Sequence, residues 1–163
     1  MKKISIMTAI IVINFILQTS FYNFVDLLGV IPNISLILVV IFAIMTGGVT
    51  GSFFGLLTGF LYDVMLYDVF GIYSLIYFII GALVGYHSEE VNRENYVLYC
   101  IITVISTVFM HVFLYIILFF LKYNLVSVGI MFRTLTIEIV LNTVFTVLIL
   151  KFVILLFERI SVK

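Results

Sequence analysis

Residues 34–66 read ISLILVVIFAIMTGGVTGSFFGLLTGFLYDVML, a run of 33 residues in which Asp63 is the only charged side chain. As one helix this run would be about 50 Å long, far more than the roughly 30 Å of a bilayer's hydrocarbon core. Gly47 and Gly48 stand side by side within it and mark the natural place for a break. We therefore predict two membrane-spanning helices here, at 34–47 and 49–66.

Further apolar runs lie on both sides of this stretch, separated by short polar segments. They cover residues 4–22 before it and 70–86, 96–121 and 131–157 after it. Each is long enough to cross a bilayer as a helix, and none alternates polar and apolar residues as a membrane β-strand would. The sequence predicts a single all-α membrane domain, a bundle of about six transmembrane helices.

The composition agrees with a membrane protein and argues against a soluble one. The chain is 65% hydrophobic and 10% charged, with a mean hydropathy of +1.39, whereas a soluble domain is about half apolar and about a quarter charged. Eight basic and eight acidic residues cancel, so no bulk field favours nucleic acid or an acidic ligand. Cys100 is the only cysteine, which excludes an internal disulfide, and we expect it to be a small buried apolar residue.

Lysine and arginine near the span ends predict the orientation, because they collect on the cytoplasmic side. No A-x-A-like cleavage site follows the first apolar run, so we expect it to remain as the first helix. Six spans with both termini in the cytoplasm leave only Lys122 and Arg133 facing out. The basic residues inside would be Lys2, Lys3, Arg93, Lys151, Arg159 and Lys163. A five-span map, with 34–66 as one helix, would lose this bias.

Glycines recur every four residues in the second half of the opening stretch. The series is Gly47, Gly51, Gly55 and Gly59, and Asp63 takes the next step. Residues four apart share a helix face, so these glycines form a groove in which another helix backbone can approach closely. We expect a helix of the same chain to lie there, and a helix of a partner protein is the alternative.

Several polar side chains fall inside the predicted spans. An ionisable group within a membrane is costly and is a functional candidate by default. We predict a polar cluster in the outer half of the bundle, made of Asp63, His111, Arg133, Glu138 and Asn142. Asp63 and Arg133 lie near outward span ends, and each lacks an opposite charge four residues away, so we expect them to pair. For His111 we expect an ordinary hydrogen bond, with a proton relay as the alternative.

Residues 55–81, GLLTGFLYDVMLYDVFGIYSLIYFIIG, resemble the hallmark segment of the rod shape-determining protein MreD family. Its pattern has two glycines four apart, an aspartate four residues later, a glycine eight beyond that, and a further glycine in the next helix. These positions are Gly55, Gly59, Asp63, Gly71 and Gly81 here. The chain length, and Pro32 ahead of the second span, also fit. We therefore add Gly71 and Gly81 to the predicted helix-packing or partner groove.

The resemblance implies a non-enzymatic, multi-pass component of the bacterial plasma membrane. It would belong to the cell-elongation machinery and associate with MreC, the actin-like filament and the peptidoglycan-building enzymes. The family also resembles, in fold, the substrate-binding S components of energy-coupling-factor transporters, and binding a vitamin in an outward pocket is the rival function. Those proteins usually carry A-x-x-x-A in the first span, whereas this chain has Ala9 with Ile13 four residues later, which favours the scaffold.

Motifs of catalytic and cofactor sites give no further candidate. The sequence contains no G-x-S-x-G, H-E-x-x-H, C-x-x-C or phosphate-binding glycine loop. We therefore expect no enzyme activity, no cofactor, no metal and no small-molecule ligand. An ion channel or an isolated membrane enzyme is a third alternative, which no residue pattern favours.

Overall fold

All the regular elements in the computed structural model are α-helices, within the described residues 2–21, 29–66, 69–88, 95–123 and 127–161. The helices are α1 (Lys2–Phe21), α2 (Ile34–Thr46), α3 (Gly48–Leu66), α4 (Ile72–Tyr86), α5 (Tyr96–Phe120) and α6 (Val128–Ser161). The predicted all-α fold is confirmed, and the helix break falls at Gly47. The side chain of Arg93 and those of the terminal basic residues lie outside the described part.

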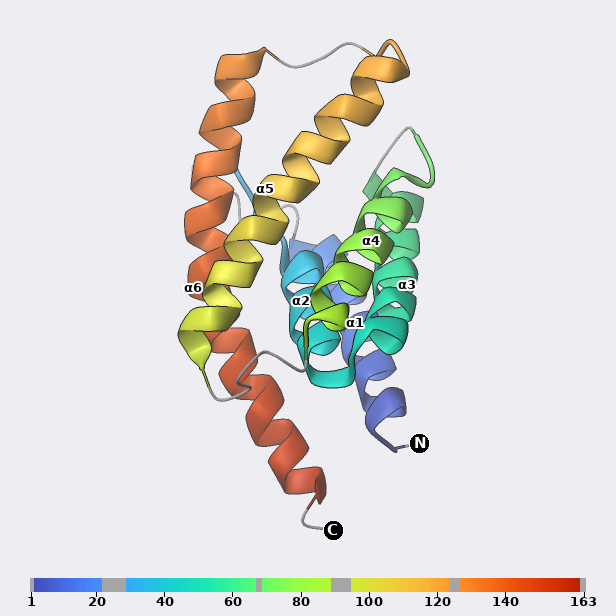
Figure 1. Cartoon of the computed structure of the whole chain (residues 1–163), viewed down its shortest axis with the longest axis vertical. Coiled ribbons are helices and arrows are strands. Elements are labelled where there is room, and N and C mark those ends of the chain that lie inside the picture. Colours follow the sequence, from blue (N-terminus) through green and yellow to red (C-terminus); the bar gives the residue numbers. More distant parts are fainter. Residues whose placement is uncertain (1, 22–28, 67–68, 89–94, 124–126, 162–163) are drawn as a thin grey trace.

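The helices alternate in direction along the bundle. α1 begins and α6 ends at one end, while α5 ends and α6 begins at the other, beyond the end of α3 (Figure 1). Two of the described helices, Tyr96–Phe120 and Val128–Phe157, are long and apolar enough to cross a membrane. Shorter apolar helices lie at Ile4–Ile16, Ile34–Thr46 and Ile72–Tyr86. The structure therefore shows a bundle of six helices, and six membrane crossings remain a prediction.

α2 is the centre of the bundle. It contacts each of the other five helices, and every residue from Ser35 to Ile44 is buried. Burial on all sides explains why this helix is apolar all round rather than on one face. The side-chain oxygen of Asn33 caps its start by accepting the Leu36 N–H at 3.0 Å. Gly47, with a φ of 89°, ends it.

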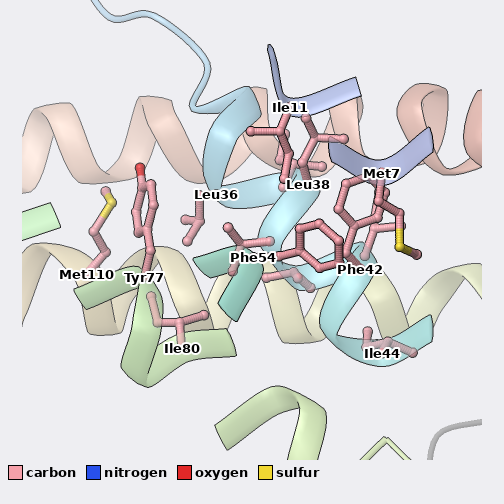
Figure 2. Packing of buried hydrophobic residues seen from close by; sticks show 14 of the residues in the cluster. Met7, Ile11, Leu36, Leu38, Phe42, Ile44, Phe54, Tyr77, Ile80 and Met110 are labelled. Atoms are coloured by element: carbon pink, nitrogen blue, oxygen red, sulfur yellow. The ribbon is translucent and has the colours of Figure 1, made fainter. Parts of the chain in front are cut away.

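Apolar side chains from the surrounding helices meet around α2, as Figure 2 shows. Phe42 of α2 lies against Phe54 of α3, with ring centroids 5.7 Å apart. The other buried contributors include Met7, Ile11, Tyr77, Ile80, Met110 and Leu150. Because these residues come from α1, α4, α5 and α6, the core joins all six helices into one unit.

α3 and α4 pack closely because glycines let their backbones meet. A Cβ on Gly51 would lie 2.8 Å from the Gly81 carbonyl oxygen, and one on Gly55 would overlap the carbonyl of Tyr77. A Cβ on Gly59 would overlap the carbonyl of Tyr73 in the same way. Along Gly51, Gly55 and Gly59 the groove is thus filled by α4 of the same chain, which leaves no room there for a helix of a partner. The assignment of Gly47 to the groove is wrong, because a Cβ on it would meet only the Ser88 hydroxyl, at 3.8 Å.

Gly71 does not pack helices together, so its assignment to the helix-packing groove is wrong. It has a φ of 100° and is the N-cap of α4, and a Cβ placed on it would meet nothing within 4 Å. A left-handed backbone is readily available only to glycine, so Gly71 serves the tight turn into α4. Gly81 does pack, since its Cβ would overlap the carbonyl of Gly51.

Candidate functional site

The aspartate of the glycine series caps the start of α4. Asp63 is only 2% exposed. Its Oδ1 accepts the Tyr73 N–H at 2.9 Å, and its Oδ2 accepts the Ser74 N–H at 2.8 Å and the Ser74 hydroxyl at 2.6 Å. The first N–H groups of a helix have no partner within it, and they form the positive end of the helix dipole. The carboxylate therefore ties α3 to α4 and finds its compensation in backbone N–H groups.

The predicted ion pair between Asp63 and Arg133 is wrong. The Asp63 carboxylate is bound to the start of α4, whereas Arg133 is exposed on α6 and forms no ion pair within the described residues. The physical reason is that helix N–H groups stabilise a buried carboxylate as a basic side chain would. Sequence spacing shows where charged residues stand, but it does not show these backbone donors.

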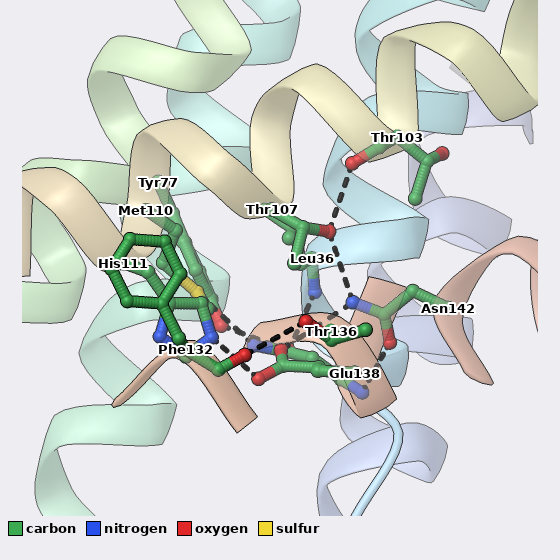
Figure 3. Close-up of polar contacts among 11 residues, drawn as sticks. Leu36, Tyr77, Thr103, Thr107, Met110, His111, Phe132, Thr136, Glu138 and Asn142 are labelled. Carbon is green, nitrogen blue, oxygen red and sulfur yellow. Dashed lines mark hydrogen bonds and ion pairs between the residues drawn. The ribbon is translucent and has the colours of Figure 1, made fainter. Parts of the chain in front are cut away.

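A ladder of buried polar side chains joins α5 to α6 (Figure 3). Each step of four residues along α5 is matched by a step of four in the opposite direction along α6. The Nε2 of His111 lies 2.7 Å from the Oε2 of Glu138. The next two rungs are Asn142 Nδ2 donating to Thr107 Oγ1 at 3.1 Å and Thr146 Oγ1 donating to Thr103 Oγ1 at 3.2 Å. The ladder fixes the register of the two longest apolar helices.

The His111–Glu138 pair is the ionisable part of this ladder. The two side chains are only 11% and 8% exposed. A buried carboxylate is costly unless it is paired and hydrogen-bonded. Glu138 meets this need through His111 and through the amide of Asn142, whose Nδ2 lies 3.4 Å from Oε1. Of the predicted polar cluster, the structure therefore brings together His111, Glu138 and Asn142.

Asn33 connects the ladder to the core, and sequence reasoning missed its part. Its backbone N–H donates to the Oδ1 of Asn142 at 2.8 Å, and its side-chain oxygen accepts the Tyr77 hydroxyl at 2.9 Å. Its amide nitrogen lies 3.3 Å from the sulfur of Met110. The local signal was present, since asparagine directly before an apolar helix is a preferred N-cap. The partners on α4, α5 and α6 are too distant in sequence to be found this way.

The buried polar groups of these two sites are used to hold helices together. Asp63 joins α3 to α4, and the ladder joins α5 to α6 and both to the start of α2. Within the part of the chain that the structure describes, no group of three or more His, Cys, Asp or Glu side chains could hold a metal ion. The arrangement is that of a fixed bundle.

A family model for the rod shape-determining protein MreD matches residues 1–156 of the 163-residue chain. The chain belongs to the MreD family. This confirms the resemblance seen in residues 55–81, and it makes the chain a bacterial membrane protein of rod shape determination. The MreD family is known as a structural family rather than as a family of enzymes. No curated protein and no solved structure matches the chain.

The structure gives the glycine and aspartate pattern of the MreD family a physical meaning. Gly55, Gly59 and Gly81 are the points at which the backbones of α3 and α4 meet. Asp63 caps α4, and Gly71 makes the turn that brings α4 back beside α3. The pattern therefore encodes a tightly packed helical hairpin.

Proposed function

We propose that this chain is a multi-pass, non-enzymatic scaffold of the cell-elongation machinery that associates with MreC and the peptidoglycan-building enzymes. Membership of the MreD family supports a role in rod shape determination. The observation that carries the scaffold role is that Asp63, Glu138 and Asn142, three buried polar side chains, are bonded to groups of neighbouring helices. A bundle fixed in this way offers its outer helix faces to partners in the membrane.

The proposal includes six membrane crossings with both termini in the cytoplasm. The beginning of α1 and the end of α6 lie at the same end of the bundle (Figure 1), as an even number of crossings requires. The larger number of lysine and arginine residues near that end favours the cytoplasmic side for it. The two basic residues left for the other end, Lys122 and Arg133, are both exposed.

The rival function, binding of a vitamin as an S component, has less support. The polar side chains that would meet a ligand, His111, Glu138 and Asn142, are bonded to one another. The A-x-x-x-A contact usual in S components is incomplete, since Ala9 is followed four residues later by Ile13. We therefore retain the scaffold as the proposed function.

Depletion of the protein in a rod-shaped bacterium without a second copy of the gene tests the role in elongation, and copurification tests the partners. We expect the cells to become round, and we expect the tagged chain to copurify with MreC from mildly solubilised membranes. Rods of normal shape after complete depletion would contradict the role in elongation. Saturable, tight binding of a vitamin to the purified protein would favour the S-component function instead.

A further inference from the structure

The end of the α5–α6 hairpin is basic and contains no acid. Residues 112–137 include Lys122 and Arg133 but no aspartate or glutamate. Both basic side chains are exposed, and neither forms an ion pair within the described residues. Glu138 of α6 and Asp63 of α3 are engaged by His111 and by the start of α4, and Asp26 and Asp68 lie outside the described residues. Within the described residues, the positive charge of the hairpin end therefore has no acidic partner.

Lys122 occupies a backbone position at which glycine is usual. Its φ is 56°, and it is the one residue other than glycine with a positive φ in the described part of the chain. Its N–H donates to the Phe119 carbonyl and the Tyr123 N–H donates to the Leu118 carbonyl, each at 3.1 Å. These two bonds are the Schellman arrangement that ends a helix, in which the left-handed residue is normally glycine. A side chain there carries a steric cost, which points to a use for the lysine.

Exposed apolar side chains lie on the same two helix ends as Lys122 and Arg133. Figure 1 shows the end of α5 and the start of α6 extending past the other helices, and seven large apolar side chains there are exposed. They are Phe119, Phe120, Leu121, Tyr123, Val128, Ile130 and Phe132. In a membrane protein such a surface is covered by acyl chains, and long basic side chains beside it extend toward the phosphate groups of the lipid.

We infer that this region, made of Lys122, Arg133 and the exposed apolar side chains of the same two helix ends, binds anionic phospholipids in the leaflet at that end, each basic side chain contacting a lipid phosphate. It is called the α5–α6 tip below. Arginine can hold two phosphate oxygens with its planar guanidinium, and lysine adds a flexible point charge. The exposed apolar side chains cover the acyl chains of these lipids. This binding is independent of the partners proposed above.

The absence of tryptophan from the chain allows a clean measurement. Phe120 is 78% exposed at the tip, so the full-length Phe120→Trp protein carries one fluorescent reporter there. In vesicles of phosphatidylcholine with phosphatidylglycerol, either lipid can be supplied in brominated form to quench it. We expect brominated phosphatidylglycerol to quench at the lower mole fraction, with a preference of about fivefold for each basic residue. The preference should fall as salt is added.

Matched variants separate this binding from general effects on the fold. Lys122→Asn removes the charge but keeps a residue that tolerates the left-handed backbone, and combined with Arg133→Gln it should abolish the preference. Lys151→Gln removes an exposed charge elsewhere on α6 and should retain it. Equal quenching by the two brominated lipids in the Phe120→Trp protein would overturn the inference. Displacement of phosphatidylglycerol by inorganic phosphate at constant ionic strength would also overturn it, in favour of a site for free phosphate.

Discussion

The carboxylate of Asp63 illustrates how an ionisable side chain can be kept inside a helical bundle without a basic partner. Two backbone N–H groups and the Ser74 hydroxyl donate to it. Its place in the glycine series was evident from the sequence, and so was the need for compensation. Its partner could not be predicted, because the donors belong to the free end of a helix ten residues later rather than to a charged side chain.

Replacement of Asp63 by asparagine tests this role. The amide of Asp63→Asn keeps one acceptor oxygen but turns an NH2 group toward donors, so a buried N–H of α4 loses its partner. We expect the free energy of unfolding to fall by about 2–3 kcal/mol, measured by thermal or denaturant unfolding in detergent. Ser74→Ala, which leaves both backbone bonds, should cost about 1 kcal/mol. A protein as stable with Asp63→Asn as with aspartate would contradict the capping role.

If Asp63 and Arg133 formed an ion pair, the protein would tolerate a swap of the two charges. We expect this swap to destabilise the protein. Asp63→Arg places a cation at the positive end of the α4 dipole, and Arg133→Asp cannot reach it from an exposed position on α6. The double variant should therefore be no more stable than Asp63→Arg alone.

At the scale of the helices, the sequence predicts most elements and few of their contacts. The break at Gly47 follows from the length of the apolar run, and the glycine spacing predicts that another helix packs on α3. The polar residues of α5 and α6 were predicted to form one cluster because each would be costly in lipid. The links of Asn33 to Asn142 and to Tyr77 were not predictable, since they depend on how three helices meet around the start of α2.

Replacements of Gly55 and Gly129 should have opposite effects, because Gly55 lies at the close contact between α3 and α4 and Gly129 lies in open space. The Cβ of Gly55→Ala would overlap the Tyr77 carbonyl, so the two backbones must separate, at a cost of about 1–3 kcal/mol in the free energy of unfolding. Gly129→Ala in α6 meets nothing within 4 Å and should be neutral or stabilise by up to about 1 kcal/mol. Unfolding of both purified proteins checks this. Equal stability of the two variants would contradict close packing at Gly55.

For the molecule as a whole, the central position of α2 reconciles its length with a membrane bundle. Its 13 residues are about 20 Å long, less than the roughly 30 Å of the hydrocarbon core. A helix enclosed by five others is covered by protein rather than lipid, so it need not match the bilayer. Composition alone predicts a membrane bundle but cannot tell an enclosed helix from a lipid-facing one, because both are continuously apolar.

Six crossings with both ends in the cytoplasm are the central claim, and thiol labelling in intact cells tests them most directly. Single cysteines are placed in a Cys100→Ser background and probed with a membrane-impermeant reagent. We expect Asp68→Cys and Tyr123→Cys to be labelled in intact cells, and Val162→Cys only after the cells are permeabilised. Labelling of Val162→Cys in intact cells, with none of Asp68→Cys, would contradict six crossings with both ends in the cytoplasm.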